Sequence, residues 1–164
     1  MENFVAIDFE TATGDRNSAC AVAIVTVEEG IIVEEYSQLI QPPSNDYTWR
    51  NIQVHGIRPN DTVNSPSFSE VYPELHKRLT GKTVVAHNEA FDRSVMQKSM
   101  ESYDIPYADL GCEEEWVCTV KKYRANGFKS AALNVLCDHF EIKLQHHDAL
   151  SDARACAKLY LKLL

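Results

Sequence analysis

The sequence predicts an α/β fold in which helices cover a mixed β-sheet, on three observations. Residues 3–10, 20–27 and 31–40 are rich in β-branched and aromatic side chains, which is typical of strands. Beyond residue 64, helical patterns alternate with short apolar strands, an order that places helices against a sheet. The length of 164 residues and the hydrophobic content of 45% are sufficient for one substantial core, so we expect a single domain over residues 1–164.

The first three strands follow one another closely, with Glu29 and Gly30 as the turn between the second and the third. This spacing predicts an antiparallel meander. Residues 41–64 contain two consecutive prolines and no sustained hydrophobic period, so we expect an irregular segment there.

The rest of the chain has four segments with helical spacing, of which 67–79 is the clearest. Ser67 and Glu70 fit a capping box, and apolar residues follow at the spacing of one helix face. Pro73 is compatible with this helix only within its first turns. The other elements are a strand at 83–87, a helix from Asn88 or Glu89 to about 103, a short strand near 116–118, a helix at 131–140 and a closing helix from about 148 to 164.

The cysteine content and the apolar runs limit the class of protein. Five cysteines without a C-x-x-C pair argue against both a disulfide framework and a structural zinc site. The longest apolar run, 19–25, is too short to span a bilayer, and the N-terminus lacks the pattern of a signal peptide. We therefore expect a cytoplasmic protein with no membrane partner.

Two carboxylates stand at the end of a first strand that begins apolar on both faces. Ala6, Asp8 and Glu10 point to the same side of this strand, so the two acidic side chains lie ~7 Å apart along the backbone. Like charges so placed repel unless a cation or water lies between them. Emergence of the strand into solvent at Asp8 is the simpler alternative, and we favour a cation.

Two further acidic residues stand in or near helix starts. Asp152 lies at the edge of the apolar stripe of the closing helix, whereas Asp148, four residues earlier, fits an N-cap. Asp92 falls in the first turn of its helix, where the dipole favours a carboxylate by ~0.3–1 kcal/mol. The dipole alone explains Asp92 in isolation, whereas the cap at Asp148 leaves Asp152 unexplained.

Four carboxylates thus lie where strands end or helices begin: Asp8, Glu10, Asp92 and Asp152. Such ends can meet at one edge of an α/β sheet, where ligand crevices form. Oxygen donors without cysteine suit Mg²⁺ or Mn²⁺ rather than zinc. Two such ions per site, ~3.5–4 Å apart, are the usual arrangement for phosphodiester displacement.

Three short motifs carry these residues: "DFE" at 8–10, "NEAFD" at 88–92 and "HDALSDA" at 147–153. In order and spacing they match D-x-E, N-x-x-F-D and H-x-A-x-x-D-A. The chain therefore resembles, over nearly its whole length, the DEDDh 3′→5′ exonuclease family, the DnaQ-like group with the proofreading domains of DNA polymerase III epsilon type. The resemblance implies a ribonuclease H-like fold, with a five-stranded mixed sheet flanked by helices.

The resemblance also implies a role for each motif residue. Asp8 would bridge two metal ions, Glu10 and Asp152 would complete the site of the first ion, and Asp92 would act near the second. His147 would be the general base that takes a proton from the attacking water. Imidazole suits this role because its ordinary pKa of about 6.5 leaves it mostly neutral at physiological pH.

His147 and Asp152 lie five residues apart in the sequence, which on one helix would separate them by roughly 140°. We therefore expect His147 in the loop before the closing helix, with Asp148 as its cap and Asp152 pointing inward. The tyrosine subclass of the family has tyrosine where this chain has Asp148, so the histidine subclass fits. His146 is expected to be a neighbour without a chemical role, although a swap of the two histidines stays open.

Four residues resemble positions at which the family contacts its substrate: Thr11, His55, Asn88 and Phe91. Thr11 follows the D-x-E motif, although Ala12 departs from the threonine-threonine-glycine often found there. "VHGI" at 54–57 resembles the loop beside the terminal base. A histidine on a surface loop explains His55 about as well as a place beside that base does. Phe91 could stack against a base, but a core aromatic explains it equally well.

The charge of the chain bears on its partners. A formal net charge of −8, from 16 basic and 24 acidic residues, disfavours a protein that holds nucleic acid on a broad basic face. An enzyme that grips only a chain end needs less basic surface, and residues 121–129 carry four basic residues and no acidic one. Lys121, Lys122 and Arg124 are candidates for holding the incoming strand, unless they form a solvated helix face.

We therefore expect a metal-dependent 3′→5′ exonuclease whose partner is a single-stranded nucleic acid 3′ end, with DNA favoured over RNA. An exoribonuclease of the ribonuclease T or oligoribonuclease kind is the first alternative. A catalytically silent nuclease fold that serves as a binding subunit is the second, and the five intact motif residues argue against it. The chain could act alone or as one domain of an assembly with a polymerase or helicase.

Overall fold

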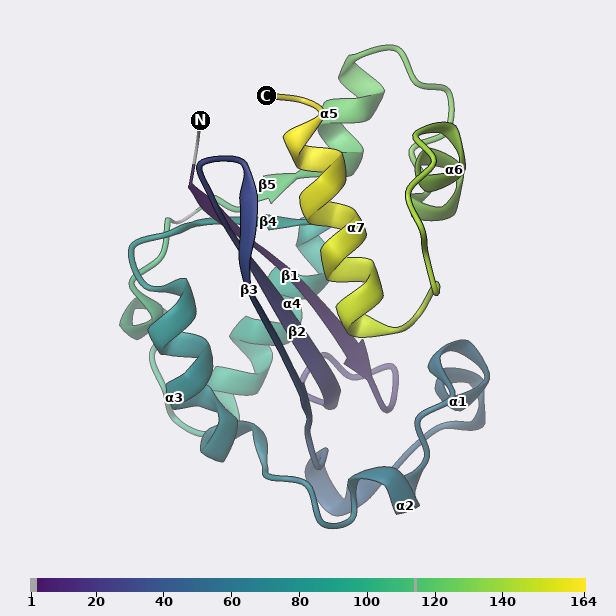
Figure 1. Ribbon diagram of the computed structural model, residues 1–164. Helices are drawn as coiled ribbons and strands as arrows, with labels where there is room; N and C mark the ends of the chain where they lie inside the picture. Colours follow the sequence, from purple (N-terminus) through teal and green to yellow (C-terminus); the bar gives the residue numbers. More distant parts are fainter. Residues whose placement is uncertain (1–2, 114) are drawn as a thin grey trace.

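A five-stranded mixed sheet forms the centre of the protein, in the strand order β3-β2-β1-β4-β5 (Figure 1). The computed structural model describes residues 3–113 and 115–164. The strands are β1 (Phe4–Thr11), β2 (Ala19–Glu28), β3 (Ile31–Leu39), β4 (Thr83–Ala86) and β5 (Val117–Cys118). β1, β2 and β3 pair antiparallel, which confirms the predicted meander, whereas β4 and β5 extend the sheet in parallel with β1.

Helices cover both faces of this sheet. They are α1 (Trp49–His55), α2 (Pro59–Thr62), α3 (Phe68–Leu79), α4 (Glu89–Glu101), α5 (Thr119–Ala125), α6 (Leu133–His139) and α7 (Ala149–Leu161), with 3₁₀ turns at Pro43–Asn45 and Tyr107–Leu110. Figure 1 shows α7 across one face of the sheet and α3 and α4 against the other. Within the described parts of the chain, no helix has both the length and the apolar character that a membrane span requires.

The two faces of β1 belong to two separate hydrophobic cores. Val5, Ile7 and Phe9 pack with residues of α3 and α4, whereas Phe4 and Ala6 pack with residues of α7. This alternation follows from the two-residue period of a strand. Asp8 and Glu10 follow Ala6 by two and four residues and therefore lie on the same side of β1, facing α7, at the carboxyl end of the strand.

Alanines bring α7 close to the sheet. Ala149, Ala153 and Ala157 lie on its inner side and share a core with Ala21 and Ala23 of β2. Because these side chains end at Cβ, the helix axis can approach the strands closely. Asp152, the residue before Ala153, is therefore held close to the carboxyl end of β1.

Parts of the segment 41–64 are helical, so the prediction that it is irregular was wrong. Thr48 caps α1, since its Oγ1 accepts a hydrogen bond from the backbone N–H of Asn51 at 3.4 Å. Gly56 ends the helix in the left-handed region, with a φ of 77°. The short helix α5 was not predicted either, and α6 and α7 end before the predicted limits, at His139 and Leu161.

Strand β3 forms one edge of the sheet and is tied to both helix layers by adjacent glutamates. The guanidinium of Arg78, from α3, lies 2.7 Å from Glu34 Oε1. The guanidinium of Arg154, from α7, lies 2.6 Å from Glu35 Oε1. Because neighbouring side chains of a strand point to opposite faces, the two ion pairs fix β3 from opposite sides.

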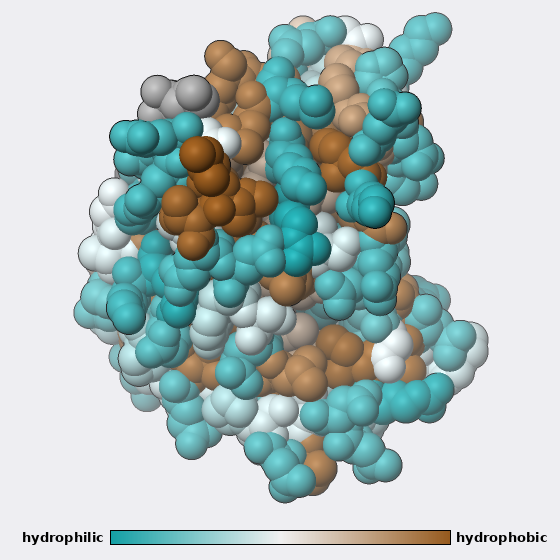
Figure 2. All heavy atoms as spheres, viewed as in Figure 1, coloured by the Kyte–Doolittle hydropathy of each residue, from teal (hydrophilic) through white to brown (hydrophobic). Residues whose placement is uncertain are grey.

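The same strand carries the most exposed aliphatic side chains of the sheet. Ile31 is 66% exposed and Val33 is 54% exposed. Figure 2 shows hydrophobic side chains gathered on the surface over the β2–β3 hairpin. An edge of this kind leaves backbone N–H and C=O groups open to solvent or to another strand.

Candidate active site

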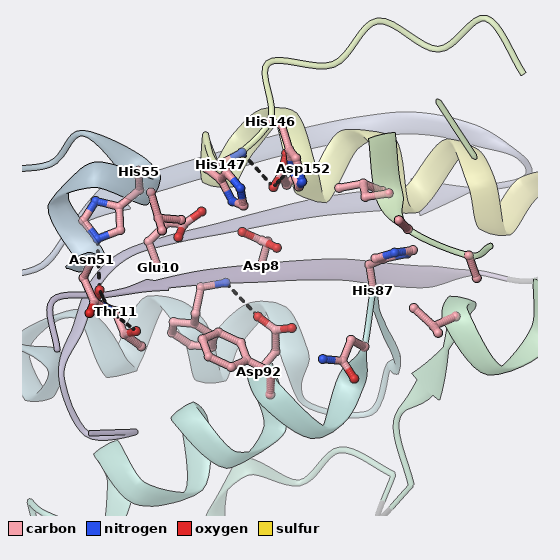
Figure 3. Close-up of a pocket in the computed structure, with 18 of the residues that line it drawn as sticks. Asp8, Glu10, Thr11, Asn51, His55, His87, Asp92, His146, His147 and Asp152 are labelled. Carbon is pink, nitrogen blue, oxygen red and sulfur yellow. Dashed lines mark hydrogen bonds and ion pairs between the residues drawn. The ribbon is translucent and has the colours of Figure 1, made fainter. Parts of the chain in front are cut away.

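Four acidic side chains from three elements converge at the carboxyl end of β1 (Figure 3). They line one open cavity of about 770 Å³ and come from β1, from the first turn of α4 and from the first turn of α7: Asp8, Glu10, Asp92 and Asp152. α4 follows directly on β4, which runs parallel to β1, so that both strands end at this edge of the sheet. The predicted convergence of these four residues is therefore what the fold produces.

Three of the four carboxylates form a tight group. One oxygen each from Asp8, Glu10 and Asp152 lie within 4.8 Å of one another. Asp92 stands outside this group, and its Oδ1 accepts a hydrogen bond from the backbone N–H of Phe9 at 2.8 Å. Figure 3 shows Asp8 between Asp92 on one side and Asp152 on the other.

Burial and mutual repulsion oppose ionisation of these groups. Burial, followed by the nearby charge of Asp92, raises the pKa of Asp8 well above its ordinary value. Burial and the charge of Asp152 raise the pKa of Glu10 to about 8. Burial likewise raises the pKa of Asp92 to about 8, although the hydrogen bond from Phe9 opposes the shift. A positive charge among these carboxylates would reverse the effect.

The donor set fits a hard divalent cation. Asp8 Oδ2 and Asp152 Oδ1 are buried and accept no hydrogen bond from the described residues. Buried polar atoms are normally satisfied, so an unpaired carboxylate oxygen needs an explanation such as an ion. Together with Glu10 these residues present only carboxylate oxygens, the ligands that Mg²⁺ and Mn²⁺ prefer.

His147 precedes α7 and turns its ring into the cavity. Its φ of 66° lies in the left-handed region, and Asp148 is the N-cap whose Oδ1 accepts a hydrogen bond from Ser151 N–H at 2.8 Å. The backbone N–H of His147 donates to Asp152 Oδ2 at 3.1 Å. Burial and the neighbouring His146 lower the pKa of the imidazole below its ordinary value. The loop position expected for this histidine and the cap expected for Asp148 are both found.

His146 is closer to the carboxylates than its expected passive role suggests. Its Nδ1 lies 3.1 Å from Asp152 Oδ2. Its ring stacks on that of His147, with centroids 3.8 Å apart and planes 16° apart. Figure 3 shows both rings beside the Asp152 side chain.

Helix α1 forms the wall of the cavity next to Thr11. The Asn51 side-chain amide donates to the carbonyl oxygens of Thr11 at 2.9 Å and Thr13 at 3.0 Å. His55 Nδ1 accepts a hydrogen bond from the backbone N–H of Ile57 at 3.0 Å. The proton of that ring therefore lies on Nε2, which donates to the Thr11 carbonyl at 2.9 Å. His55 lines the cavity from this fixed orientation.

Asn88 and Phe91 line the opposite wall. Asn88 has a φ of 67°, a left-handed conformation that turns the chain from β4 into α4. Phe91 packs partly against the core, and the guanidinium carbon of Arg16 lies over its ring, 4.3 Å from the centroid. Phe91 therefore contacts the core, as one of the two alternatives predicted, and also lines the cavity.

Several cavity residues were missed from the sequence: Arg50, Asn51, His87, Lys129 and the segment 130–133. His87 Nδ1 lies 2.8 Å from Thr119 Oγ1, and burial lowers the pKa of its ring to about 4. Of the basic residues proposed to hold the strand, Arg124 lines the cavity, whereas Lys121 forms a 2.9 Å ion pair with Glu89. Asn51 and His55 lie four residues apart, and that helical spacing is the one signal that could have identified the wall.

Sequence comparison places this chain among exonucleases. The exonuclease family profile of the RNase T type matches residues 5–160. The DNA polymerase III subunit epsilon of Aquifex aeolicus is 30% identical over 167 residues, which cover 98% of this chain and 80% of that protein. The PolC-type DNA polymerase III of Thermotoga petrophila is also 30% identical, over 98% of this chain but 12% of its own length. The chain thus spans about one eighth of the PolC-type relatives.

Solved structures give the same result for the fold. Exonuclease X, in complex with 5′ overhanging duplex DNA, has a TM-score of 0.76 and 26% identity, over 98% of this chain and 90% of that one. Exonuclease I has a TM-score of 0.85 at 17% identity, over 99% of this chain and 40% of that one, which indicates a shared fold. With its ribonuclease H-like sheet, its three motifs and a profile match over nearly its whole length, the chain belongs to the exonuclease family of the DnaQ and RNase T type.

Proposed function

We propose that this protein is a metal-dependent 3′→5′ exonuclease that releases nucleoside 5′-monophosphates from DNA 3′ ends. The observation that carries the proposal is the convergence of four carboxylates and a histidine of lowered pKa in one open cavity. Membership of an exonuclease family supports the reaction class, and the cavity offers the residues for it.

Two divalent ions, Mg²⁺ or Mn²⁺, would be held by the carboxylates. Asp8, Glu10 and Asp152 would bind one ion, because their oxygens already lie within 4.8 Å of one another. Asp92 would act near the second ion, with Asp8 shared between the two. When bound, such ions neutralise the carboxylates and stabilise negative charge on the attacking and leaving oxygens of the phosphodiester.

His147 would be the general base. Its imidazole is neutral at physiological pH because burial and His146 lower its pKa, so it can accept a proton from water. The water oxygen bonds to the terminal phosphorus, and the bond from phosphorus to the preceding 3′ oxygen breaks. The products are a nucleoside 5′-monophosphate and a chain with a new 3′ hydroxyl, which takes its proton from solvent.

The substrate end would lie between the wall formed by α1 and the wall formed by the start of α4. Thr11 and His55 would contact the terminal nucleotide from the first wall, and Asn88 and Phe91 from the second. Arg124 lines the same cavity and would meet a backbone phosphate.

DNA is the favoured substrate because relatives that cover the chain are DNA polymerase III components. The same relatives make a polymerase assembly the proposed setting of this domain. An exoribonuclease is the second candidate, since the matching profile is of the RNase T type.

The test is digestion of single-stranded oligomers labelled at either end, with Mg²⁺, with Mn²⁺ and with EDTA. The proposal predicts a metal-dependent ladder from 5′-labelled DNA and immediate release of labelled mononucleotide from 3′-labelled DNA. Asp8→Asn should abolish both, whereas Asp138→Asn, the same change at an exposed carboxylate outside the cavity, should have no effect. Intact DNA in both metals would refute a DNA exonuclease, and faster digestion of matched RNA would favour the second candidate.

A further inference from the structure

Two imidazole rings stand against one buried carboxylate at the start of α7. A ring nitrogen from each of His146 and His147 and an oxygen of Asp152 lie within 4.8 Å of one another. His146 Nδ1 is already 3.1 Å from Asp152 Oδ2. The backbone at His147 is left-handed, and its ring stacks on that of His146 with 3.8 Å between the centroids.

The chemistry of this group differs from that of the carboxylate group beside it. Asp8, Glu10 and Asp152 offer three oxygens, whereas the histidine group offers two nitrogens and one oxygen. Mg²⁺ binds oxygen ligands, but imidazole and carboxylate together suit zinc and similar transition ions. Asp152 belongs to both groups, so the two sets of donors compete for one carboxylate.

We propose that His146, His147 and Asp152 form a second metal site that binds Zn²⁺ in preference to Mg²⁺. Around a tetrahedral zinc ion, donors at ~2.0–2.2 Å from the metal lie roughly 3.4 Å from one another. The donors therefore need to close by little more than about 1 Å. The His146 side chain is 39% exposed, which leaves room for this adjustment.

Zinc at this site blocks the nuclease reaction, a consequence that rests on the proposed function. The ion takes the lone pair of His147, which then cannot accept a proton. It also draws the Asp152 carboxylate away from Asp8 and Glu10. The enzyme would thus be inhibited by a transition ion in the presence of the ions that activate it.

Binding is tested without any nuclease assay, by competition for Zn²⁺ with a chromophoric chelator in excess Mg²⁺. Cys112 is the one described cysteine that is not buried, so the measurements use Cys112→Ser protein. His146→Asn keeps an amide near the position of Nδ1, able to bond Asp152, but is a poor zinc ligand. We expect zinc affinity to fall by about tenfold or more in His146→Asn, and to be unchanged in the matched control His76→Asn, on α3 outside both groups.

Equal zinc affinity in His146→Asn and in the unsubstituted protein would overturn the proposal. His146→Leu, which removes the hydrogen bond as well, checks the result: both variants must lose zinc if His146 is a ligand. Circular dichroism melts establish that each variant is folded.

Inhibition is measured separately, as the ratio of Mg²⁺-supported digestion with and without Zn²⁺ within each variant. We expect this ratio to be low in the unsubstituted protein and to approach one in His146→Asn at the same zinc concentration. Zinc inhibition unchanged in His146→Asn would overturn the inhibitory role. If no digestion occurs in any variant, the proposed function fails while the chelator competition still decides the zinc site.

Discussion

Asp8 is the residue at which the requirements of the site most strongly oppose the stability of the fold. Its carboxylate is buried, Oδ2 has no hydrogen-bond partner among the described residues, and Asp92, Glu10 and Asp152 all raise its pKa. A neutral side chain of the same shape would remove that repulsion.

Asp8→Asn should therefore stabilise the metal-free protein while abolishing its activity. We expect the free energy of unfolding to rise by about 1 kcal/mol, or about 3 °C in melting midpoint, and the stabilisation by Mg²⁺ to disappear. Thermal melts with and without Mg²⁺ measure both, with Asp138→Asn as control. A less stable Asp8→Asn protein would show that Asp8 supports the fold rather than strains it.

His147 should govern both the rate and the pH dependence of the reaction. We expect His147→Ala to lower kcat by about 10²–10⁴-fold with the fold intact, and His76→Ala to leave kcat unchanged. Because only the neutral imidazole accepts a proton, the activity should rise with pH through the pKa of His147 and then level off. That pKa is lowered, so the rise should lie below pH 6.5. Normal turnover in His147→Ala would exclude it as the base and direct attention to His146.

At the residue scale, the site residues predicted from the sequence include those that interrupt a hydrophobic pattern. The cavity residues that were missed interrupt no such pattern. Asp8 and Glu10 interrupt an apolar strand, and Asp152 lies beside an apolar stripe, so each required an explanation. His87 and Asn51 interrupt nothing. Their importance comes from hydrogen bonds to Thr119, Thr11 and Thr13 that only the folded chain creates.

At the element scale, α7 positions the site through the small size of its inner residues. Ala153 is fully buried against β2 and adjoins Asp152 in the chain. A larger side chain here must push the helix away from the sheet or adopt a strained rotamer.

Ala153→Leu should therefore destabilise the protein by about 1–3 kcal/mol and reduce its activity, because Asp152 moves with the helix. Lys158→Leu adds the same side chain at an exposed position of α7 and should change stability by less than about 0.5 kcal/mol. Urea unfolding and initial rates of DNA digestion measure the two effects. Full activity in a destabilised Ala153→Leu protein would separate the position of α7 from catalysis.

The predictability of an element depended on whether it buries an apolar stripe. The capping box of α3 and its stripe were predicted from spacing, and α3 accommodates Pro73 in its second turn. α1 has no buried residue, so it has no hydrophobic period that a sequence could reveal. α5 has only two buried residues, Thr119 and Tyr123, too few for a hydrophobic period to be distinguished. Residues of both helices nevertheless line the cavity, and this is why its lining was harder to predict than its four carboxylates.

At the scale of the whole molecule, the cluster of carboxylates should link stability to pH and to metal ions. The pKa values of Glu10 and Asp92 are raised to about 8 in the folded protein, from 4.5 and 3.8. Between those values the native state binds more protons than the unfolded state. The free energy of unfolding therefore includes the full stabilising contribution of Glu10 and Asp92 at acidic pH. This contribution is lost as pH rises through about 8.

We accordingly expect Mg²⁺ to raise the melting midpoint by an amount that increases from pH 5 to pH 8. The ion replaces the protons that the carboxylates lose, so the largest benefit falls where the metal-free protein is least stable. Melts across this range with Mg²⁺ or EDTA test it, and the Mg²⁺ effect should shrink in Glu10→Gln. A Mg²⁺ effect independent of pH would contradict the link.

The two ion pairs on β3 have a consequence for solubility. An unpaired edge strand with exposed aliphatic side chains is a template on which copies of a protein add to one another and aggregate. Any copy that paired with β3 would have to strip water from the charged groups of Glu34 and Glu35, which flank that edge on opposite faces of the sheet. Arg154 holds the pKa of Glu35 below its ordinary value, so this protection persists into acidic solution. We therefore infer that the contacts that join β3 to the helices also oppose aggregation along this edge, at a distance from the carboxylate cavity.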